Sequence, residues 1–226
     1  MLLVSNLKNI NISREYGSKH QFRRKALEIG LSKNDYFIVI HRNAYDWIRS
    51  LHKDPHHAPE LLYLPFSKFI RSPWRTYLGQ NWKKIILNEE SKKMITESYE
   101  NVIELRKSKM KYFLSFPDNS NLVHLNYEQL LSDPYKKLKE IAIKFNLEIG
   151  EEFTEVNTYK KTNKKFSGSH YSMISKKDLT FINQQLDWSV ENKLGYNQED
   201  YESSLFSHTI NLIKIKIPKF FIRIMR

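Results

Sequence analysis

The residues Tyr36-Phe-Ile-Val-Ile-His-Arg-Asn-Ala-Tyr-Asp-Trp-Ile-Arg-Ser50 contain two hydrophobic periods in succession. The apolar run 37–40 is short and rich in β-branched residues, which is typical of a strand buried on both faces. The apolar residues after it recur at helical spacing: Ala44, Trp47, Ile48 and Leu51. Asn43 is suited to the N-cap of that helix. Strand, turn and helix in this order predict an α/β fold, a three-layer sandwich with a central parallel sheet.

The turn between this strand and helix is a candidate anion site. In α/β folds such a turn lies at the carboxyl end of a strand, where the helix N-terminus offers N–H groups and a positive dipole end. Arg42 stands in the turn, and Ser50 returns to nearly the same side of the helix as Asn43. A guanidinium fork, a helix start and a hydroxyl are donors that suit a phosphate.

The run Val39 to Ser50, continuing into Pro55-His-His-Ala-Pro59, resembles the 3′-phosphate-binding segment of sulfotransferases. In that family an Arg after a strand and a Ser eight residues later bind the 3′-phosphate of 3′-phosphoadenosine 5′-phosphosulfate. Arg42 and Ser50 have this spacing, although Ala44 stands where the family more often has Pro. The resemblance implies a P-loop-NTPase-like sulfotransferase fold and transfer of a sulfuryl group to a hydroxyl acceptor, most simply a carbohydrate or small molecule.

A second strand is expected at 121–127, followed by a helix with Asp133 as N-cap and Pro134 at its first position. The helix has an apolar stripe: Leu138, Ile141, Ala142 and Phe145. Tyr127-Glu-Gln-Leu-Leu-Ser-Asp-Pro134 is similar to the Tyr-Glu-Asp-Leu-Leu-x-Asp-Pro segment of sulfotransferases. The resemblance makes Tyr127 a candidate cofactor contact and Glu128 a brace for the loop, while the alternative for Tyr127 is a strand-end residue packed on the sheet.

Lys19 and His20 form the candidate catalytic pair. A Lys/His pair precedes the phosphate-binding arginine by a similar interval in sulfotransferases, where the His is the general base. Neutral imidazole accepts a proton near pH 7, and Lys19 would offset charge on the leaving group. The alternative for this dipeptide is a solvated surface pair.

The Gly-rich loop that holds the 5′-phosphosulfate in this family has no counterpart before residue 20, because the six glycines are isolated from one another. We therefore expect an N-terminally shortened sulfotransferase, either a fragment or a degenerate copy. The alternative function is a non-catalytic protein that binds only the 3′-phosphate end of the nucleotide. Sulfotransferases often close the nucleotide site with a basic loop, typically containing Arg-Lys-Gly, at the place of the lysine-rich segment 150–172. This chain has no such tripeptide, and the resemblance leaves Lys164 and Lys165 as candidate cofactor contacts. The alternative is a solvated loop.

The whole-chain composition sets further limits. A length of 226 residues with 40% apolar content predicts one domain, 1–226. Cysteine is absent, which excludes disulfides and thiolate metal sites. No long apolar stretch occurs, so we expect a soluble, cytoplasmic protein. The net charge of +12 favours acidic ligands or reflects compositional bias. We expect no metal requirement, because Pro55 interrupts the helix between His52 and the pair His56 and His57. We expect no nucleic-acid partner, because the sequence contains no recognised nucleic-acid-binding motif.

Four other segments carry secondary expectations. The aromatic-rich region 61–82 forms core or lines an acceptor cleft. Apolar residues alternating with charge predict one or two amphipathic helices over 92–116. Ser175 caps a helix that runs to about residue 192 and ends at Gly195. The basic, isoleucine-rich tail 210–226 either contacts an anionic membrane weakly or packs on the domain.

Overall fold

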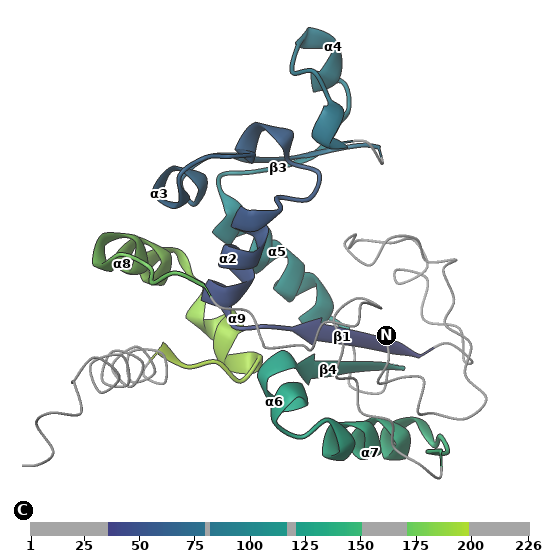
Figure 1. Ribbon diagram of the computed structural model, residues 1–226. Helices are drawn as coiled ribbons and strands as arrows, with labels where there is room; N and C mark the ends of the chain where they lie inside the picture. Colours follow the sequence, from purple (N-terminus) through teal and green to yellow (C-terminus); the bar gives the residue numbers. More distant parts are fainter. Residues whose placement is uncertain (1–35, 80–81, 117–120, 151–170, 199–226) are drawn as a thin grey trace, which may run out of the picture. The chain divides into compact units, whose positions relative to one another are not determined.

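The computed structural model describes residues 36–79, 82–116, 121–150 and 171–198 (Figure 1). The chain divides into two compact units, residues 1–186 and 187–226. The described part of the second unit contains α9 (Trp188–Lys193), which is followed by Gly195 at φ +82°, as its role as a left-handed helix end predicts. The expectation of a single domain stays a prediction, and the tail 210–226 lies outside the described residues.

A parallel pair of strands is the centre of the first unit. β1 (Phe37–His41) pairs with β4 (Leu122–Asn126), in a register that places Phe37 opposite Leu122 and His41 opposite Asn126. The two strands predicted from the apolar runs are therefore present, and they are parallel neighbours. The described chain is mixed α/β with a small parallel sheet, which agrees with the predicted class at this coarser level.

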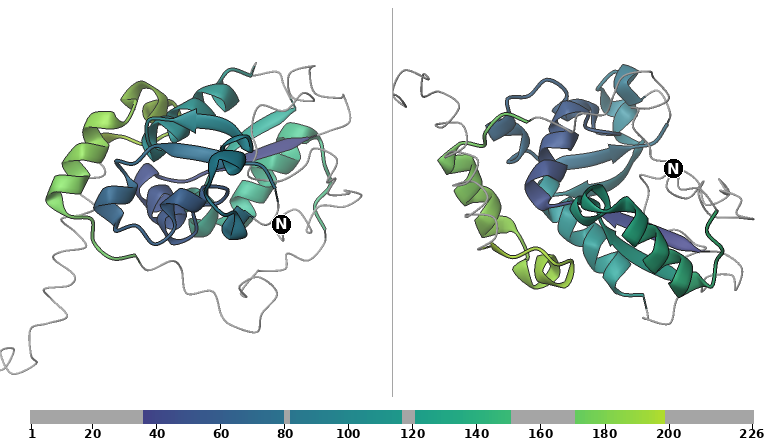
Figure 2. Two further views of the ribbon diagram at one scale, coloured as in Figure 1. Left: turned by 90° about the horizontal axis from the view of Figure 1, so that it is seen from above. Right: turned by 60° about the horizontal axis from the view of Figure 1, so that its bottom comes forward.

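Helix α7 (Pro134–Phe145) covers one face of this sheet, as the right-hand view of Figure 2 shows. Asp133 caps it by accepting a hydrogen bond from the Lys136 N–H at 3.0 Å, and Pro134 occupies its first position, as predicted. All members of its predicted stripe are buried against Leu125 of β4: Leu138, Ile141, Ala142 and Phe145. The helical period of the stripe therefore predicted the packing correctly.

Helices α2 (Ala44–Lys53) and α5 (Val102–Leu114) form a second group. Arg106 of α5 is fully buried, and its guanidinium lies 5.5 Å from the Trp47 ring centroid of α2. His124, which alternates with Leu125 along β4, donates a hydrogen bond from its imidazole to the backbone carbonyl of Phe113 in α5, so that its face of the strand is turned away from α7.

The prediction that the first strand is buried on both faces is wrong. Its last isoleucine, Ile40, is 54% exposed, and residues 37–39 are only half buried. Ile38 packs against the cluster under α7, whereas Ile40 lies two residues farther along the same face and is not part of that cluster. Within the described part of the chain, only β4 pairs with this strand.

The region 92–116 is not one helical segment. It contains the end of α4 (Glu89–Lys92), then β3 (Ile95–Tyr99), then α5. β3 pairs antiparallel with β2 (Trp74–Tyr77). The reason is non-local: Ile95, Glu97 and Tyr99 are paired with residues of the preceding aromatic region, and this pairing overrides a pattern that also fits a helix.

The aromatic region 61–82 forms mainly core in the part that is described. Phe69, Trp74 and Tyr77 are buried, whereas Tyr63 is almost fully exposed. Short helical turns, η2 (Pro59–Leu61), α3 (Phe66–Phe69) and η3 (Trp82–Lys84), complete this region.

The predicted helix over 176–192 is divided in two. α8 (Lys176–Gln185) begins after the predicted cap Ser175, whose hydroxyl accepts a hydrogen bond from the Asp178 N–H at 3.2 Å. It ends at Leu186, which adopts an extended conformation, and α9 begins after Asp187. Neither residue is a glycine or proline, so the usual sequence signal for a helix break is missing.

Candidate functional site

Arg42 and Tyr127 come together at the carboxyl ends of the two parallel strands. Arg42 directly follows β1, and Tyr127 directly follows β4 as the first residue of α6 (Tyr127–Ser132). Because His41 is opposite Asn126 in the register, the next residue of each strand lies at the same edge. The Arg42 guanidinium carbon is 4.8 Å from the Tyr127 ring centroid, a distance at which the cation is attracted to the ring face.

The remaining contacts of the Arg42 guanidinium hold it in one direction. It donates to Asp46 Oδ2 at 2.8 Å and to the Tyr171 hydroxyl at 3.2 Å. Burial lowers the pKa of Arg42, but Asp46 and Tyr171 outweigh this effect and raise it above its usual value. The guanidinium is therefore charged and held in one orientation, and its buried Nε donor has no hydrogen-bond partner among the described residues.

A further set of charges continues along the same face of α2. Arg49 bonds to the other carboxylate oxygen of Asp46 and donates to the Ser172 carbonyl at 3.0 Å. The Arg49 guanidinium carbon and the Lys53 Nζ lie 5.0 Å and 4.6 Å from the Tyr171 ring centroid. We call Arg42, Asp46, Arg49, Lys53, Tyr127 and Tyr171 the Arg42 cluster.

Several members of this cluster were missed in the sequence analysis. The spacing of Arg42, Asp46, Arg49 and Lys53 by three or four residues carried the signal, because such residues share a helix face. Tyr171 had no comparable signal, since it follows a lysine-rich segment of irregular composition. Its place beside α2 depends on a long-range contact.

Ser50 lies on the same helix face. It is one turn beyond Asp46 and one turn before Lys53, and its side chain is exposed. The predicted joint contact of Arg42 and Ser50 with one phosphate stays a prediction, because no ligand is present.

The helix start is less available to an anion than the sequence predicted. Asn43 caps α2 through its side chain, which accepts from the Asp46 N–H at 2.8 Å. Glu128 Oε1 accepts from the Asn43 backbone N–H at 3.0 Å and from its side-chain amide at 2.6 Å. The predicted bracing role of Glu128 is therefore confirmed. A carboxylate already neutralises part of the positive end of the helix dipole, because it binds where an external anion would bind.

Two histidines of the parallel strands lie near α5: His41, which is buried and senses the charge of Arg106, and His124, which is half-buried and bonds to the backbone of Phe113. His41 is 5% exposed, and its ring centroid is 6.0 Å from that of His124. Burial, together with His124 and Arg106, lowers the pKa of His41 to about 4. Burial also lowers the pKa of His124. Both imidazoles are therefore neutral near pH 7.

The other candidate residues lie outside the described part of the chain: Lys19, His20, Lys164 and Lys165. Among the residues that are described, no group of metal-ligating side chains is close enough to hold an ion. None of the described helices has the length and apolar character needed to cross a bilayer.

Comparisons with protein-family models, with curated proteins and with solved structures found no match to this chain.

Proposed function

We propose that this protein is a sulfotransferase that moves a sulfuryl group from 3′-phosphoadenosine 5′-phosphosulfate to a hydroxyl acceptor, most simply a carbohydrate. The observation that supports the proposal is the contact between Arg42 and Tyr127. These residues belong to the two segments that resemble sulfotransferases, and they lie at one edge of a parallel sheet. That edge is where α/β folds bind nucleotides. The proposal includes a P-loop-like sulfotransferase fold.

In this proposal the Arg42 cluster binds the 3′-phosphate. Asp46 pairs with Arg42 and Arg49, and Lys53 lies on the same helix face beside the Tyr171 ring, so the cluster holds three cations and one carboxylate. A phosphate beside Arg42 would accept charge-assisted hydrogen bonds from the guanidinium, and Ser50 would add a hydroxyl donor. Asp46 holds both arginines in position before the ligand arrives, which reduces the entropy lost on binding. Burial raises the pKa of Tyr127, although Arg42 works against this effect, so its phenol stays protonated and can donate to the nucleotide.

The transfer step assigns roles to the remaining candidates. His20 would take the proton from the acceptor hydroxyl as its oxygen forms a bond to sulfur. The bond from sulfur to the bridging phosphate oxygen would break, and adenosine 3′,5′-bisphosphate would leave with the electron pair. Lys19 would stabilise the charge on that leaving group. Lys164 and Lys165 are proposed as additional nucleotide contacts.

Isothermal titration calorimetry on the full chain with adenosine 3′,5′-bisphosphate tests the nucleotide site. We expect Arg42→Ala to weaken binding about 10- to 100-fold, because charge-assisted hydrogen bonds are lost. Ser50→Ala should have a smaller effect in the same direction. The matched control is Arg75→Ala, which also removes an arginine paired with a carboxylate, Glu60 at 2.8 Å, but away from the cluster.

The choice of nucleotide makes the test specific. Adenosine 5′-monophosphate lacks the 3′-phosphate, so the Arg42 substitution should leave its affinity unchanged. Equal affinities of the Arg42→Ala and Arg75→Ala proteins for the bisphosphate would refute the proposed phosphate site.

The second candidate is a non-catalytic protein that binds only the 3′-phosphate end. It is favoured by the fact that the groups brought together around Arg42 are those expected at that end of the nucleotide. Transfer of labelled sulfate from the donor to a panel of hydroxyl compounds separates the two functions. Nucleotide binding by the original protein with no transfer to any acceptor would favour the second function, whereas transfer that is lost in His20→Ala would favour the enzyme.

A further inference from the structure

The connection between β2 and β3 carries a group of exposed apolar side chains. β2 ends at Tyr77 and β3 begins at Ile95, so the intervening residues lie at one end of the hairpin. Four large apolar residues are strongly exposed there: Leu78 at 59%, Ile86 at 79%, Leu87 at 50% and Met94 at 36%. Leu78 and Met94 are held beside each other, because the Leu78 N–H donates to the Met94 carbonyl at 2.8 Å. Ile86 and Leu87 are neighbours in sequence, so the connection presents two exposed apolar pairs, which makes it a candidate binding surface.

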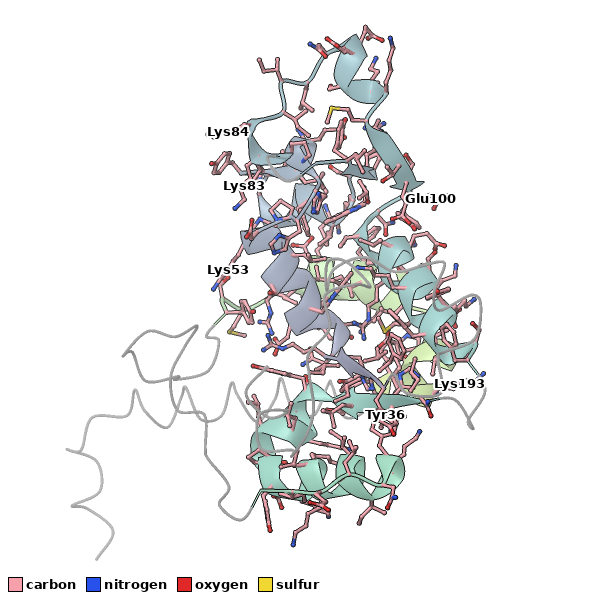
Figure 3. All side chains as sticks on the ribbon, turned by 90° about the vertical axis from the view of Figure 1, so that its right-hand side faces the viewer. Tyr36, Lys53, Lys83, Lys84, Glu100 and Lys193 are labelled. Carbon is pink, nitrogen blue, oxygen red and sulfur yellow. The ribbon has the colours of Figure 1, made fainter. Side chains whose placement is uncertain are left out.

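Lysines flank these apolar residues. Lys83 and Lys84 precede the apolar pair in sequence, and both are exposed. Lys83 also forms an ion pair with Asp54 at 2.6 Å, which places it beside the end of α2. Figure 3 shows Lys53, Lys83 and Lys84 along one edge. We call Leu78, Lys83, Lys84, Ile86, Leu87 and Met94 the tip surface.

The acidic residues of the segment 83–93 lie at the start of α4. Glu89 and Glu90 lie in the first turn of α4, where negative charge stabilises the helix dipole, and Glu89 pairs with Lys92. Between residues 83 and 93 there are four lysines and two glutamates. The segment is therefore cationic, like the chain as a whole.

The local structure keeps the apolar residues in place. Asn88, which follows Leu87, caps α4 and exchanges side-chain hydrogen bonds with Ser91 in a capping box. Gly79, beside Leu78, adopts a φ of +115° that other residues rarely adopt. The capping box orders the chain directly after Leu87, and the hydrogen bond from Leu78 to Met94 orders the other apolar pair.

We propose that the tip surface inserts into the headgroup layer of an anionic membrane. Aliphatic side chains that are exposed beside lysines fit this partner, because the apolar groups enter the acyl boundary while the ammonium groups contact acidic headgroups. Long lysine stems reach the interface from the flanks. This surface is separate from the Arg42 cluster, and the proposal does not depend on the proposed function.

Sedimentation of the full chain with vesicles tests the proposal. The probes are vesicles of phosphatidylcholine alone and vesicles of phosphatidylcholine and phosphatidylserine in equal parts. We expect binding to the anionic vesicles and weaker binding at high salt. The double variant Ile86→Asp with Leu87→Asp should lower the partition coefficient on the order of 100-fold. Lys84→Ala should lower it about fivefold.

Two residues of α7 provide matched controls. Ile143 is 80% exposed, nearly the same as Ile86, and Lys136 is exposed like Lys84. Ile143→Asp and Lys136→Ala should leave the partition coefficient within about twofold of the original. Circular dichroism of each variant checks that the fold is retained.

Four outcomes would overturn the proposal. The first is no binding of the original protein to anionic vesicles. The second is an equal loss of binding with Ile143→Asp and with the tip variants. The third is binding that is insensitive to the tip variants and is removed by truncation after residue 209, which would assign membrane contact to the tail. A change of mass in solution caused by the tip variants, without an effect on vesicles, would instead identify a contact between copies of this chain.

Discussion

Lowering the pH from about 7 to about 5 tests the buried imidazole of His41, which precedes Arg42 at the end of β1. The pKa of His41 falls from 6.5 to about 4 in the folded protein, because burial, His124 and Arg106 disfavour the charged imidazole. In the unfolded chain the imidazole titrates near its ordinary value. Between these two pKa values the unfolded state binds more protons than the folded state, so the free energy of unfolding rises with pH. Acidification therefore destabilises the fold.

The size of this effect follows from the two pKa values. Across the full window, from above 6.5 to below 4, the loss from His41 is about 3 kcal/mol. Between pH of about 7 and about 5 it is about 2 kcal/mol. His124, whose pKa is also lowered by burial, adds a loss of the same sign. Glu128 works in the opposite direction on His41, and its effect is the smallest of the four causes.

Urea unfolding followed by circular dichroism at the two pH values measures the loss. His41→Asn should lower stability at both pH values and remove about 2 kcal/mol of the pH dependence. Leu125→Ala is the matched control, because it removes buried packing in the neighbouring strand without removing a titrating group. It should keep the full pH dependence. If His41→Asn retains the pH dependence of the original protein, the reasoning from burial of His41 is wrong.

Two further substitutions test the packing and the bracing of the first unit by urea unfolding. Leu138→Ala removes a fully buried side chain from the cluster under α7 and should lower the free energy of unfolding by about 3 kcal/mol. Ile143 on the same helix is 80% exposed, so Ile143→Ala should change it by no more than about 0.5 kcal/mol. Equal losses for the two variants would contradict the assigned orientation of α7. Glu128→Ala removes two hydrogen bonds to Asn43 and should cost about 2 kcal/mol. The control Glu140→Ala removes a carboxylate that is about half exposed and paired with a lysine, and it should lower the free energy of unfolding by less than about 0.5 kcal/mol. A similar loss for both glutamate variants would refute the bracing role of Glu128.

Local signals predicted the elements that build the candidate site. A short β-branched run followed by Asn43 and a helical stripe predicted β1 and α2, and both are present with the expected cap. Asp133 and Pro134 predicted the start of α7. These predictions succeeded because caps and hydrophobic periods act within one or two turns of the chain.

The elements that were missed depend on distant partners. Ile95 to Tyr99 forms a strand because β2 is available for pairing, and the spacing of its apolar residues alone did not distinguish it from a helix. The exposure of Ile40 follows from the extent of the cluster that covers Ile38. The break between α8 and α9 occurs without a glycine or proline.

The sequence by itself determined the mixed α/β class, the caps of α2 and α7, and the position of Arg42 after a strand, because each follows from short-range chemistry. Only the tertiary structure decided that Arg42 contacts Tyr127 and Tyr171, and that Glu128 occupies the start of α2. Contacts between residues far apart in the chain depend on strand register and on side-chain packing in the core, and neither can be deduced from a short segment of sequence.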